Sequence, residues 1–201
     1  MVRIISGRAR GRKLQVPEGA VVRPTSDRVR EALFNILVHR HHVPLAGTRV
    51  LDLFGGAGTL GLEALSRGAE EVWFVEQDAA VARVLASNLK ALGGNTRLVN
   101  QPVAQFLTGP VRSAGQPPSA VRKSPFGLVF LDPPYHIGAV APTLAALVDG
   151  WLTPAAWVVI EHPSDEVVVP PEPLGIQDQR IYGGTTVTLL ARAIPADGGG
   201  R

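Results

Sequence analysis

The sequence predicts an α/β fold in which a largely parallel sheet is covered by helices on both faces. From Arg49 onwards, short apolar segments alternate regularly with segments of helical periodicity. The apolar segments are almost continuously hydrophobic, as strands buried on both faces are. With 201 residues, 45% of them hydrophobic, and no Cys, the chain can bury one well-packed core without disulfides.

The elements of this domain can be assigned in order along the chain. Strands are expected at 49–54, 71–77, 96–100, 127–134 and 155–163, followed by a pair of strands over 177–192. Helices are expected at 59–68, 78–94 and 137–152. Residues 108–125 are rich in Gly, Pro, Ser and Arg, which is typical of a surface loop.

The first 44 residues form an extension before this domain. Residues 3–17 alternate apolar segments around a Gly/Arg turn and predict a small hairpin. Residues 23–40 carry a cap cluster and then apolar residues at helical spacing. The chain therefore divides into an N-terminal extension (1–44), a main domain (45–194) and a tail expected to be disordered (195–201).

Positive charge is concentrated in this extension. The net charge of the chain is +3, but the first 30 residues hold eight Lys and Arg against two acidic residues, which gives +6 there. A basic pole suggests that a polyanion docks at one end, with nucleic acid as the leading candidate; a solvated basic arm is the alternative. The candidate phosphate contacts are Arg8, Arg10, Arg12 and Lys13.

The location of the protein follows from what the sequence lacks. No apolar run approaches the roughly 20 residues that span a bilayer, and the N-terminus does not have the pattern of a signal peptide. A cytoplasmic protein that does not contact membranes is expected.

A glycine-rich turn stands between the first expected strand and helix of the domain, in VLDLFGGAGTLGLEAL. Such a turn brings the backbone close to a ligand, and Glu76, at the end of the next strand, could accept hydrogen bonds from ribose hydroxyls. These features fit a nicotinamide dinucleotide as well as S-adenosylmethionine. Asp52 favours S-adenosylmethionine, because a carboxylate would bind the ammonium of its methionine part and repel a pyrophosphate.

The segment FLDPPYH (130–136) ends the fourth expected strand with a carboxylate and two prolines. An exocyclic amine on a nucleobase is a poor nucleophile, because its lone pair is delocalised into the ring. If the Asp132 carboxylate and the Pro133 carbonyl each accept one amine proton, the nitrogen is favoured in the pyramidal form that can attack. Pro134 helps to fix the backbone, and Tyr135 offers a face on which a base can stack. A simple strand-ending turn is the alternative.

These motifs resemble a known family. The order VLDLFGGAG, Glu76 and LDPPY resembles class I methyltransferases that modify exocyclic amines. The N-terminal segments RIISGRARGRKL and RPTSDRVREALFNIL are similar to bacterial 16S ribosomal RNA guanine-N2 methyltransferases, and the resemblance covers residues 2–192. It implies a Rossmann-like fold, a mixed seven-stranded sheet with a reversed terminal strand pair, and a small N-terminal extension.

The resemblance also implies a cofactor, a substrate and a set of site residues. The cofactor is S-adenosylmethionine, and the methyl acceptor is a guanine of 16S rRNA in small-subunit or assembly-intermediate particles, modified by a monomeric enzyme. The cofactor residues carried over are Arg23, Thr25, Asp52, Phe54, Gly55, Gly56, Gly58, Glu76, Gln77 and Asn100, and the catalytic residues are Asp132, Pro133, Pro134 and Tyr135. Asn100 or Gln101 stands where the family often has a carboxylate that contacts the adenine amine.

Three other functions stay open at this stage. The acceptor could be adenine N6 in DNA or RNA, the glycine turn could serve a dinucleotide oxidoreductase, or the fold could serve a non-catalytic RNA-binding assembly factor. A metal site is not expected: His39, His41 and His42 cluster at a helix end without a carboxylate at ligand spacing.

Overall fold

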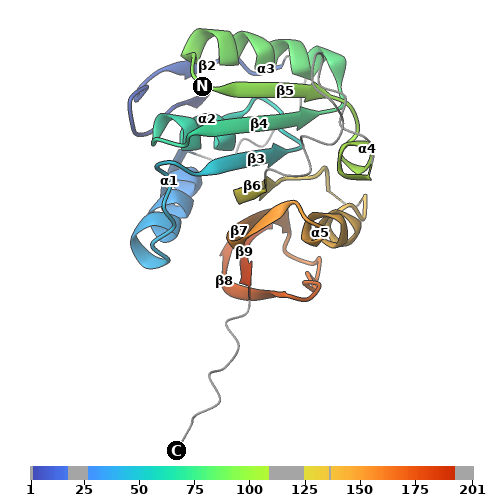
Figure 1. Cartoon of the computed structure of the whole chain (residues 1–201). Coiled ribbons are helices and arrows are strands. Elements are labelled where there is room, and N and C mark those ends of the chain that lie inside the picture. Colours follow the sequence, from blue (N-terminus) through green and yellow to red (C-terminus); the bar gives the residue numbers. More distant parts are fainter. Residues whose placement is uncertain (1, 18–26, 109–124, 136, 193–201) are drawn as a thin grey trace, which may run out of the picture.

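The computed structural model describes residues 2–17, 27–108, 125–135 and 137–192 (Figure 1). Several predictions fall outside this range: the cofactor residues Arg23 and Thr25, most of the loop at 108–125, and the tail at 195–201.

The centre of the molecule is a mixed seven-stranded sheet, as predicted. Its strands are β3 (Arg49–Leu53), β4 (Glu71–Glu76), β5 (Thr96–Asn100), β6 (Phe126–Leu131), β7 (Leu152–Pro163), β8 (Leu174–Tyr182) and β9 (Thr185–Arg192). They lie in the order β5-β4-β3-β6-β7-β9-β8. The first five strands in this order are mutually parallel, and β9 is antiparallel to both of its neighbours.

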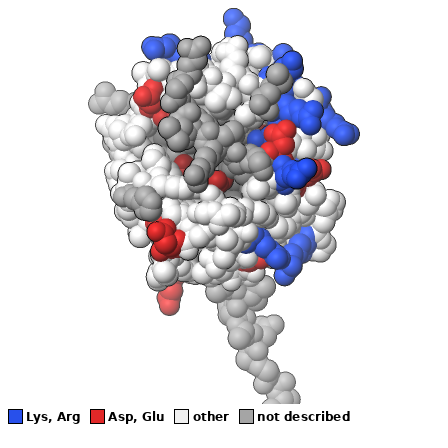
Figure 2. All heavy atoms as spheres, turned by 180° about the vertical axis from the view of Figure 1, so that it is seen from behind, with Lys and Arg blue, Asp and Glu red and all other residues white. Residues whose placement is uncertain are grey.

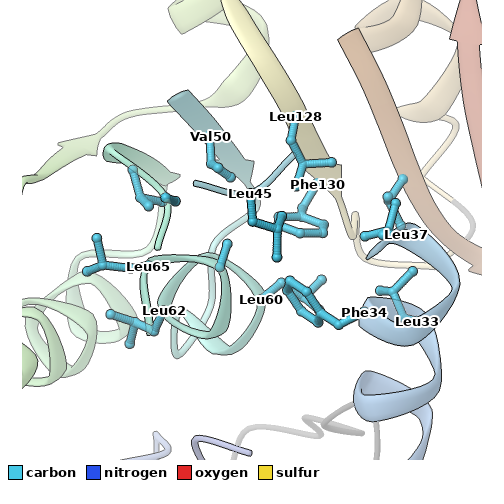
Figure 3. Packing of buried hydrophobic residues seen from close by; sticks show 14 of the residues in the cluster. Leu33, Phe34, Leu37, Leu45, Val50, Leu60, Leu62, Leu65, Leu128 and Phe130 are labelled. Carbon is cyan, nitrogen blue, oxygen red and sulfur yellow. The ribbon is translucent and has the colours of Figure 1, made fainter. Parts of the chain in front are cut away.

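Helices cover both faces of the sheet (Figure 1). They are α1 (Asp27–Asn35), continued by a π-helical segment η1 (Ile36–Arg40), then α2 (Thr59–Ser66), α3 (Ala79–Leu92), α4 (Val103–Thr108) and α5 (Val140–Val148). The alternation of side chains along β3 assigns each helix to a face. Val50 packs with residues of α1, α2 and α3, as Figure 3 shows for α1 and α2, whereas Leu51 packs with residues of α4 and α5.

Several boundaries differ from the sequence prediction, and one helix was not predicted. The six-residue helix α4 begins directly after Pro102 and buries Phe106 and Leu107 against the sheet. The helix predicted over 137–152 is confined to α5, because Gly150 has a φ of +88°, a left-handed conformation that a helix cannot continue through. The strand predicted from residue 155 accordingly starts earlier, at Leu152.

The predicted N-terminal hairpin is present and is docked on the domain. Strands β1 (Val2–Arg3) and β2 (Lys13–Leu14) pair in antiparallel fashion. Glu63 of α2, which is fully buried, accepts hydrogen bonds from the main-chain N–H groups of Ile5 (2.7 Å) and Ser6 (3.0 Å). The main chain of the hairpin is therefore held against α2, and its basic side chains extend into solvent.

Candidate active site

The carboxyl ends of five parallel strands bring the predicted site residues to one edge of the sheet. The strand order places β3 beside β6, while the chain passes from β3 through α2 to β4 on the other side. Ligands of open α/β sheets bind at such a switch in strand order. The glycine turn follows β3 and the Asp132 segment follows β6, so the two motifs flank the switch point.

The glycine turn has a backbone that even an alanine side chain would disrupt at Gly58. Phe54 has a φ of 60° and Gly58 a φ of 81°, both in the left-handed region. The N–H groups of Gly55 and Gly58 donate to the carbonyls of Val75 (3.0 Å) and Gly55 (2.7 Å), respectively. A Cβ on Gly58 would lie 2.5 Å from Leu85. The turn is thus fixed by close packing on one side and by backbone hydrogen bonds.

Gly56 differs from the other glycines of the turn. Its φ is 54°, and a Cβ added there would meet only the Phe54 carbonyl oxygen, at 3.9 Å. The space outside its Cα is open. A ligand can therefore approach the main chain most closely at Gly56.

Asp52 is buried beneath the turn, with 3% of its surface exposed. The N–H of Gly61 donates to its Oδ2 at 2.9 Å. Burial raises the pKa of Asp52 to about 7; the Gly61 hydrogen bond opposes this shift and the nearby Glu76 adds to it. A cation placed here would favour the ionised form, and this is the electrostatic basis for binding an ammonium group.

Glu76 and Asn100 form the next part of the edge. The Glu76 carboxylate accepts hydrogen bonds from the N–H groups of Gly56 (3.0 Å) and Asp78 (2.8 Å), one on each oxygen. Asn100 donates through Nδ2 to the carbonyls of Glu76 (2.7 Å) and Gln77 (3.1 Å). The amide of Asn100 is thereby oriented so that its Oδ1 could accept a hydrogen bond from a ligand amine.

Asp132 lies between the glycine turn and β7. Leu131 is paired with Leu53 of β3 and with Ile160 of β7, so the next residues, Asp132 and Glu161, follow these pairs at the strand ends. Burial raises the pKa of Asp132 well above its ordinary value, and the carboxylates of Glu161 and Asp52 raise it further. Part of the Asp132 residue is still accessible to solvent.

The rest of the segment is fixed by β9. Pro133 is buried and Pro134 is exposed. The Tyr135 hydroxyl shares a hydrogen bond of 2.6 Å with Thr185 Oγ1 at the start of β9, opposite Pro163 of β7. This bond holds the half-buried Tyr135 ring near the end of the sheet.

The four basic candidates of the hairpin are all exposed, but they differ in their contacts. Arg8 donates to the Gly93 carbonyl at the end of α3, at 3.1 Å, so part of its guanidinium is used within the protein. Arg10, Arg12 and Lys13 project from the turn and from β2. Figure 2 shows Lys and Arg side chains gathered mostly along one margin of the face that it displays.

Of the histidines near the end of η1, His41 has structural contacts. The ring of His41 packs on Trp157 with a centroid distance of 4.7 Å, and its Nε2 lies 3.5 Å from Asp178 Oδ2. Within the described ranges, no group of three or more His, Asp and Glu side chains is placed to hold a metal ion. In the same ranges, no helix is long and apolar enough to cross a bilayer.

Three residues of this region have roles that the sequence did not predict. Gly61 is absent from the predicted site, but its N–H donates to Asp52, and a Cβ there would lie 2.4 Å from Phe74. Thr185 fixes Tyr135, and the buried Asn88 of α3 bonds to the glycine turn. For Asn88 the signal was available: a polar residue stands in the apolar stripe that contains Leu85 and Leu89.

Comparisons with known proteins identify the family of this chain. A family described as Conserved hypothetical protein 95 matches residues 2–191. Ribosomal RNA small subunit methyltransferase D of Escherichia coli K12 is 42% identical over 162 residues, 80% of this chain and 74% of the relative. The protein of the same name from Haemophilus influenzae is 40% identical over 175 residues, 85% of this chain and 83% of the relative.

A solved structure has a similar fold. The structure described as a putative methyltransferase yhhF from Escherichia coli superposes with a TM-score of 0.80 at 37% identity, covering 95% of this chain and 97% of that chain. The fold is thus that of class I methyltransferases, and the chain belongs to the family described as Conserved hypothetical protein 95, as a relative of ribosomal RNA small subunit methyltransferase D.

Proposed function

We propose that this chain transfers a methyl group from S-adenosylmethionine to the exocyclic N2 of a guanine in 16S rRNA of the small ribosomal subunit. The observation that carries the proposal is the position of Asp132, at the switch point directly beside the glycine turn. The names of the relatives support a small-subunit rRNA substrate. Such an enzyme would work in the cytoplasm as a monomer.

The residues around the turn fit S-adenosylmethionine. Asp52 would bind the ammonium of the methionine part, and the open face of Gly56 would let the cofactor approach the main chain. Each Glu76 oxygen accepts one main-chain hydrogen bond and can accept another, so Glu76 would bind the ribose hydroxyls. We further assign Phe54, Gly55, Gly58 and Gln77 to the walls of this site, Asn100 to the adenine, and Arg23 and Thr25 to a segment over the cofactor.

The sulfonium of the cofactor supplies an activated methyl group, and the protein supplies position and electrostatics. Asp132, once ionised, would accept one proton of the guanine amine and the Pro133 carbonyl the other, which favours the nucleophilic form of the nitrogen. Tyr135 would stack on the base, with its ring held by Thr185. The attacked nitrogen becomes acidic on methylation, so it can release its proton without a strong base.

The hairpin would hold the RNA. Arg10, Arg12 and Lys13, and Arg8 with the part of its guanidinium that faces solvent, would contact phosphates, and these contacts would position the RNA without reading its sequence.

The product of the reaction tests this function. Purified protein and radiolabelled S-adenosylmethionine are incubated with small-subunit particles from cells that lack the enzyme, and the RNA is digested to nucleosides and separated. Label in N2-methylguanosine is the expected result. Label in N6-methyladenosine would replace the guanine acceptor with adenine, and the absence of label despite measured cofactor binding would contradict catalysis on this substrate.

A further inference from the structure

Asn88 is a buried polar residue in the helix layer, with 3% of its surface exposed and with Leu85 and Leu89 as buried neighbours on α3. Burying an amide among apolar side chains is unfavourable unless it is hydrogen-bonded. Each polar atom of the Asn88 amide is used: Oδ1 accepts from the N–H of Gln15 at 2.9 Å, and Nδ2 donates to the carbonyls of Gln15 (2.9 Å) and Ala57 (3.0 Å). The side chain therefore joins two segments that are far apart in the sequence.

The first segment is the glycine turn. The Ala57 carbonyl and the Gly58 N–H belong to one peptide unit, and the Gly58 N–H donates to the Gly55 carbonyl at 2.7 Å. Asn88 holds the oxygen of this peptide and Gly55 holds its nitrogen, so the plane of the peptide is fixed from both sides. Gly56, the open glycine of the turn, directly precedes this unit.

The second segment is the end of the basic hairpin. Gln15 directly follows β2, and the Asn88 amide bonds to both of its main-chain polar groups in the manner of a neighbouring strand. The rest of the hairpin is held by α2: Ser66 Oγ accepts from the Ala9 N–H at 3.0 Å and donates to the Ser6 carbonyl at 2.6 Å. The Ser66 contacts do not involve the glycine turn, whereas those of Asn88 do.

We propose that Asn88 is a positioning residue that links the cofactor turn to the RNA-facing hairpin, so that each of these segments stabilises the other through one amide. The inference rests on the proposed function, because it takes the turn as the cofactor site and the hairpin as an RNA contact. By linkage, cofactor binding that orders the turn must also order the hairpin, and the effect is reciprocal. Asn88 touches neither ligand and acts through Ala57 and Gln15.

Two variants and a matched control test this link. Asn88→Leu keeps the approximate size of the side chain and removes all three hydrogen bonds. Asn88→Asp keeps the acceptor for the Gln15 N–H and loses both donors, so it serves if the leucine variant does not fold. Ser66→Ala is the control, because it removes two of the hydrogen bonds that hold the hairpin on α2 without a change at the glycine turn.

The measurements are the affinity for S-adenosylhomocysteine by calorimetry and the amide hydrogen exchange of residues 2–17 with and without that ligand at saturation. For the unsubstituted protein we expect binding together with slower exchange in the hairpin. Either Asn88 variant should bind about tenfold more weakly, the cost of roughly one hydrogen bond, and saturation should no longer slow exchange in the hairpin. Ser66→Ala should exchange faster in the hairpin but retain both the affinity and the slowing by ligand.

The outcomes separate this inference from the proposed function. If the unsubstituted protein does not bind the ligand, the cofactor site itself is wrong. If it binds and the Asn88 variants bind equally well, or if their hairpins are still protected by the ligand, Asn88 is a structural residue only and the proposed link is wrong. A general loss of stability would raise exchange throughout the chain and leave the ligand-dependent difference in the hairpin intact.

Discussion

At the scale of single residues, the site is dominated by carboxylates that the fold keeps close together. The negative charges of Asp52 and Glu161 both repel that of Asp132. The negative charge of Glu76 in turn repels that of Asp52. Burial, together with this arrangement, raises the pKa values of Asp52 and Asp132 in the protein without cofactor. A cationic ligand relieves the repulsion, so the acidic edge favours a cofactor that carries positive charge.

The pH dependence of the methyl-transfer rate should show that the negative charge of Glu161 raises the pKa of Asp132. Asp132 must be ionised to accept a proton, and its raised pKa places the acidic limb of the rate profile above the ordinary range of Asp, near 3.9. Glu161→Gln removes one negative charge, lowers the pKa of Asp132 and should shift this limb to lower pH. The exposed Asp149, at the opposite edge of the sheet, gives the control Asp149→Asn, which should leave the limb in place. An unchanged limb in Glu161→Gln would contradict the assignment.

We expect the Asp52 carboxylate to lower the free energy of unfolding and to raise the affinity for the cofactor. Its folded-state pKa of about 7 lies above the ordinary value of 3.8, so the free energy of unfolding falls as the pH rises from about 4 to 7. A shift of this size corresponds to a cost on the order of 4 kcal/mol at pH 8. Asp52→Asn should therefore raise the melting temperature of the cofactor-free protein at pH 8 by about 5 °C or more. The gain should vanish near pH 4.

Calorimetric titration of the same variant tests the predicted contribution of Asp52 to cofactor affinity. Without the carboxylate, affinity for S-adenosylhomocysteine at pH 8 should fall at least about tenfold, because the ligand ammonium loses its counter-charge. An Asp52→Asn protein that is less stable at pH 8, or that binds the ligand as tightly as before, would show that Asp52 has a different role.

At the scale of elements, the N-terminal hairpin depends on one close approach to α2. Gly7 has a φ of +81°, and a Cβ there would lie 1.9 Å from the Ser66 carbonyl oxygen. Gly11, in the same hairpin, has a φ of +83° but no atom within 4 Å of such a Cβ. The two glycines share the backbone conformation and differ in packing.

Alanine at each of these glycines separates the two effects. Gly11→Ala should cost about 1 kcal/mol, for a non-glycine residue in the left-handed region. Gly7→Ala should cost clearly more, because the hairpin must also move away from α2. Thermal or denaturant unfolding measures both changes. Equal losses for the two variants would mean that the docking of the hairpin on α2 contributes no stability.

The elements also show what the sequence can predict. Regular alternation of apolar strands and periodic helices, each several residues long, was enough to predict the parallel part of the sheet, whereas its reversed strand was implied by the family resemblance. The helix α4 escaped prediction because its six residues after Pro102 give too short a periodic pattern. The positions of the glycine turn and of Asp132 at the ends of their strands were predictable, because each motif is one short continuous segment of sequence. The roles of Asn88 and Thr185 were not, because their partners lie between 31 and 73 residues away.

At the scale of the whole molecule, the fold separates the two tasks of the proposed enzyme. The carboxyl edge of the sheet holds the chemistry, while the hairpin on the α2 side carries positive charge that is concentrated in the first 30 residues. Residues 31–201 sum to a net charge of −3, the difference between +3 for the chain and +6 for its start. Long-range attraction should therefore orient a polyanion with its backbone over the hairpin.

The salt dependence of RNA affinity tests this orientation. Substitution of Arg10, Arg12 and Lys13 by Ala should weaken binding to small-subunit RNA. The slope of log affinity against log salt should fall by up to about 1 for each phosphate that the protein no longer neutralises. Arg192→Ala is the control, since this exposed arginine ends β9, which lies next to the edge strand β8 and is separated from β3 by β6 and β7. A slope that is unchanged in the triple variant would place the RNA elsewhere.

The central claim, that Asp132 activates the target amine, is tested most directly by single-turnover methyl transfer with Asp132→Asn. Asparagine keeps the shape of the side chain but replaces one acceptor oxygen with an N–H donor. We expect the rate to fall by about 10²-fold or more, as for the removal of a proton-accepting group, while affinities for S-adenosylhomocysteine and for RNA change less than about threefold. A variant that transfers methyl groups at nearly the original rate would show that Asp132 does not activate the amine.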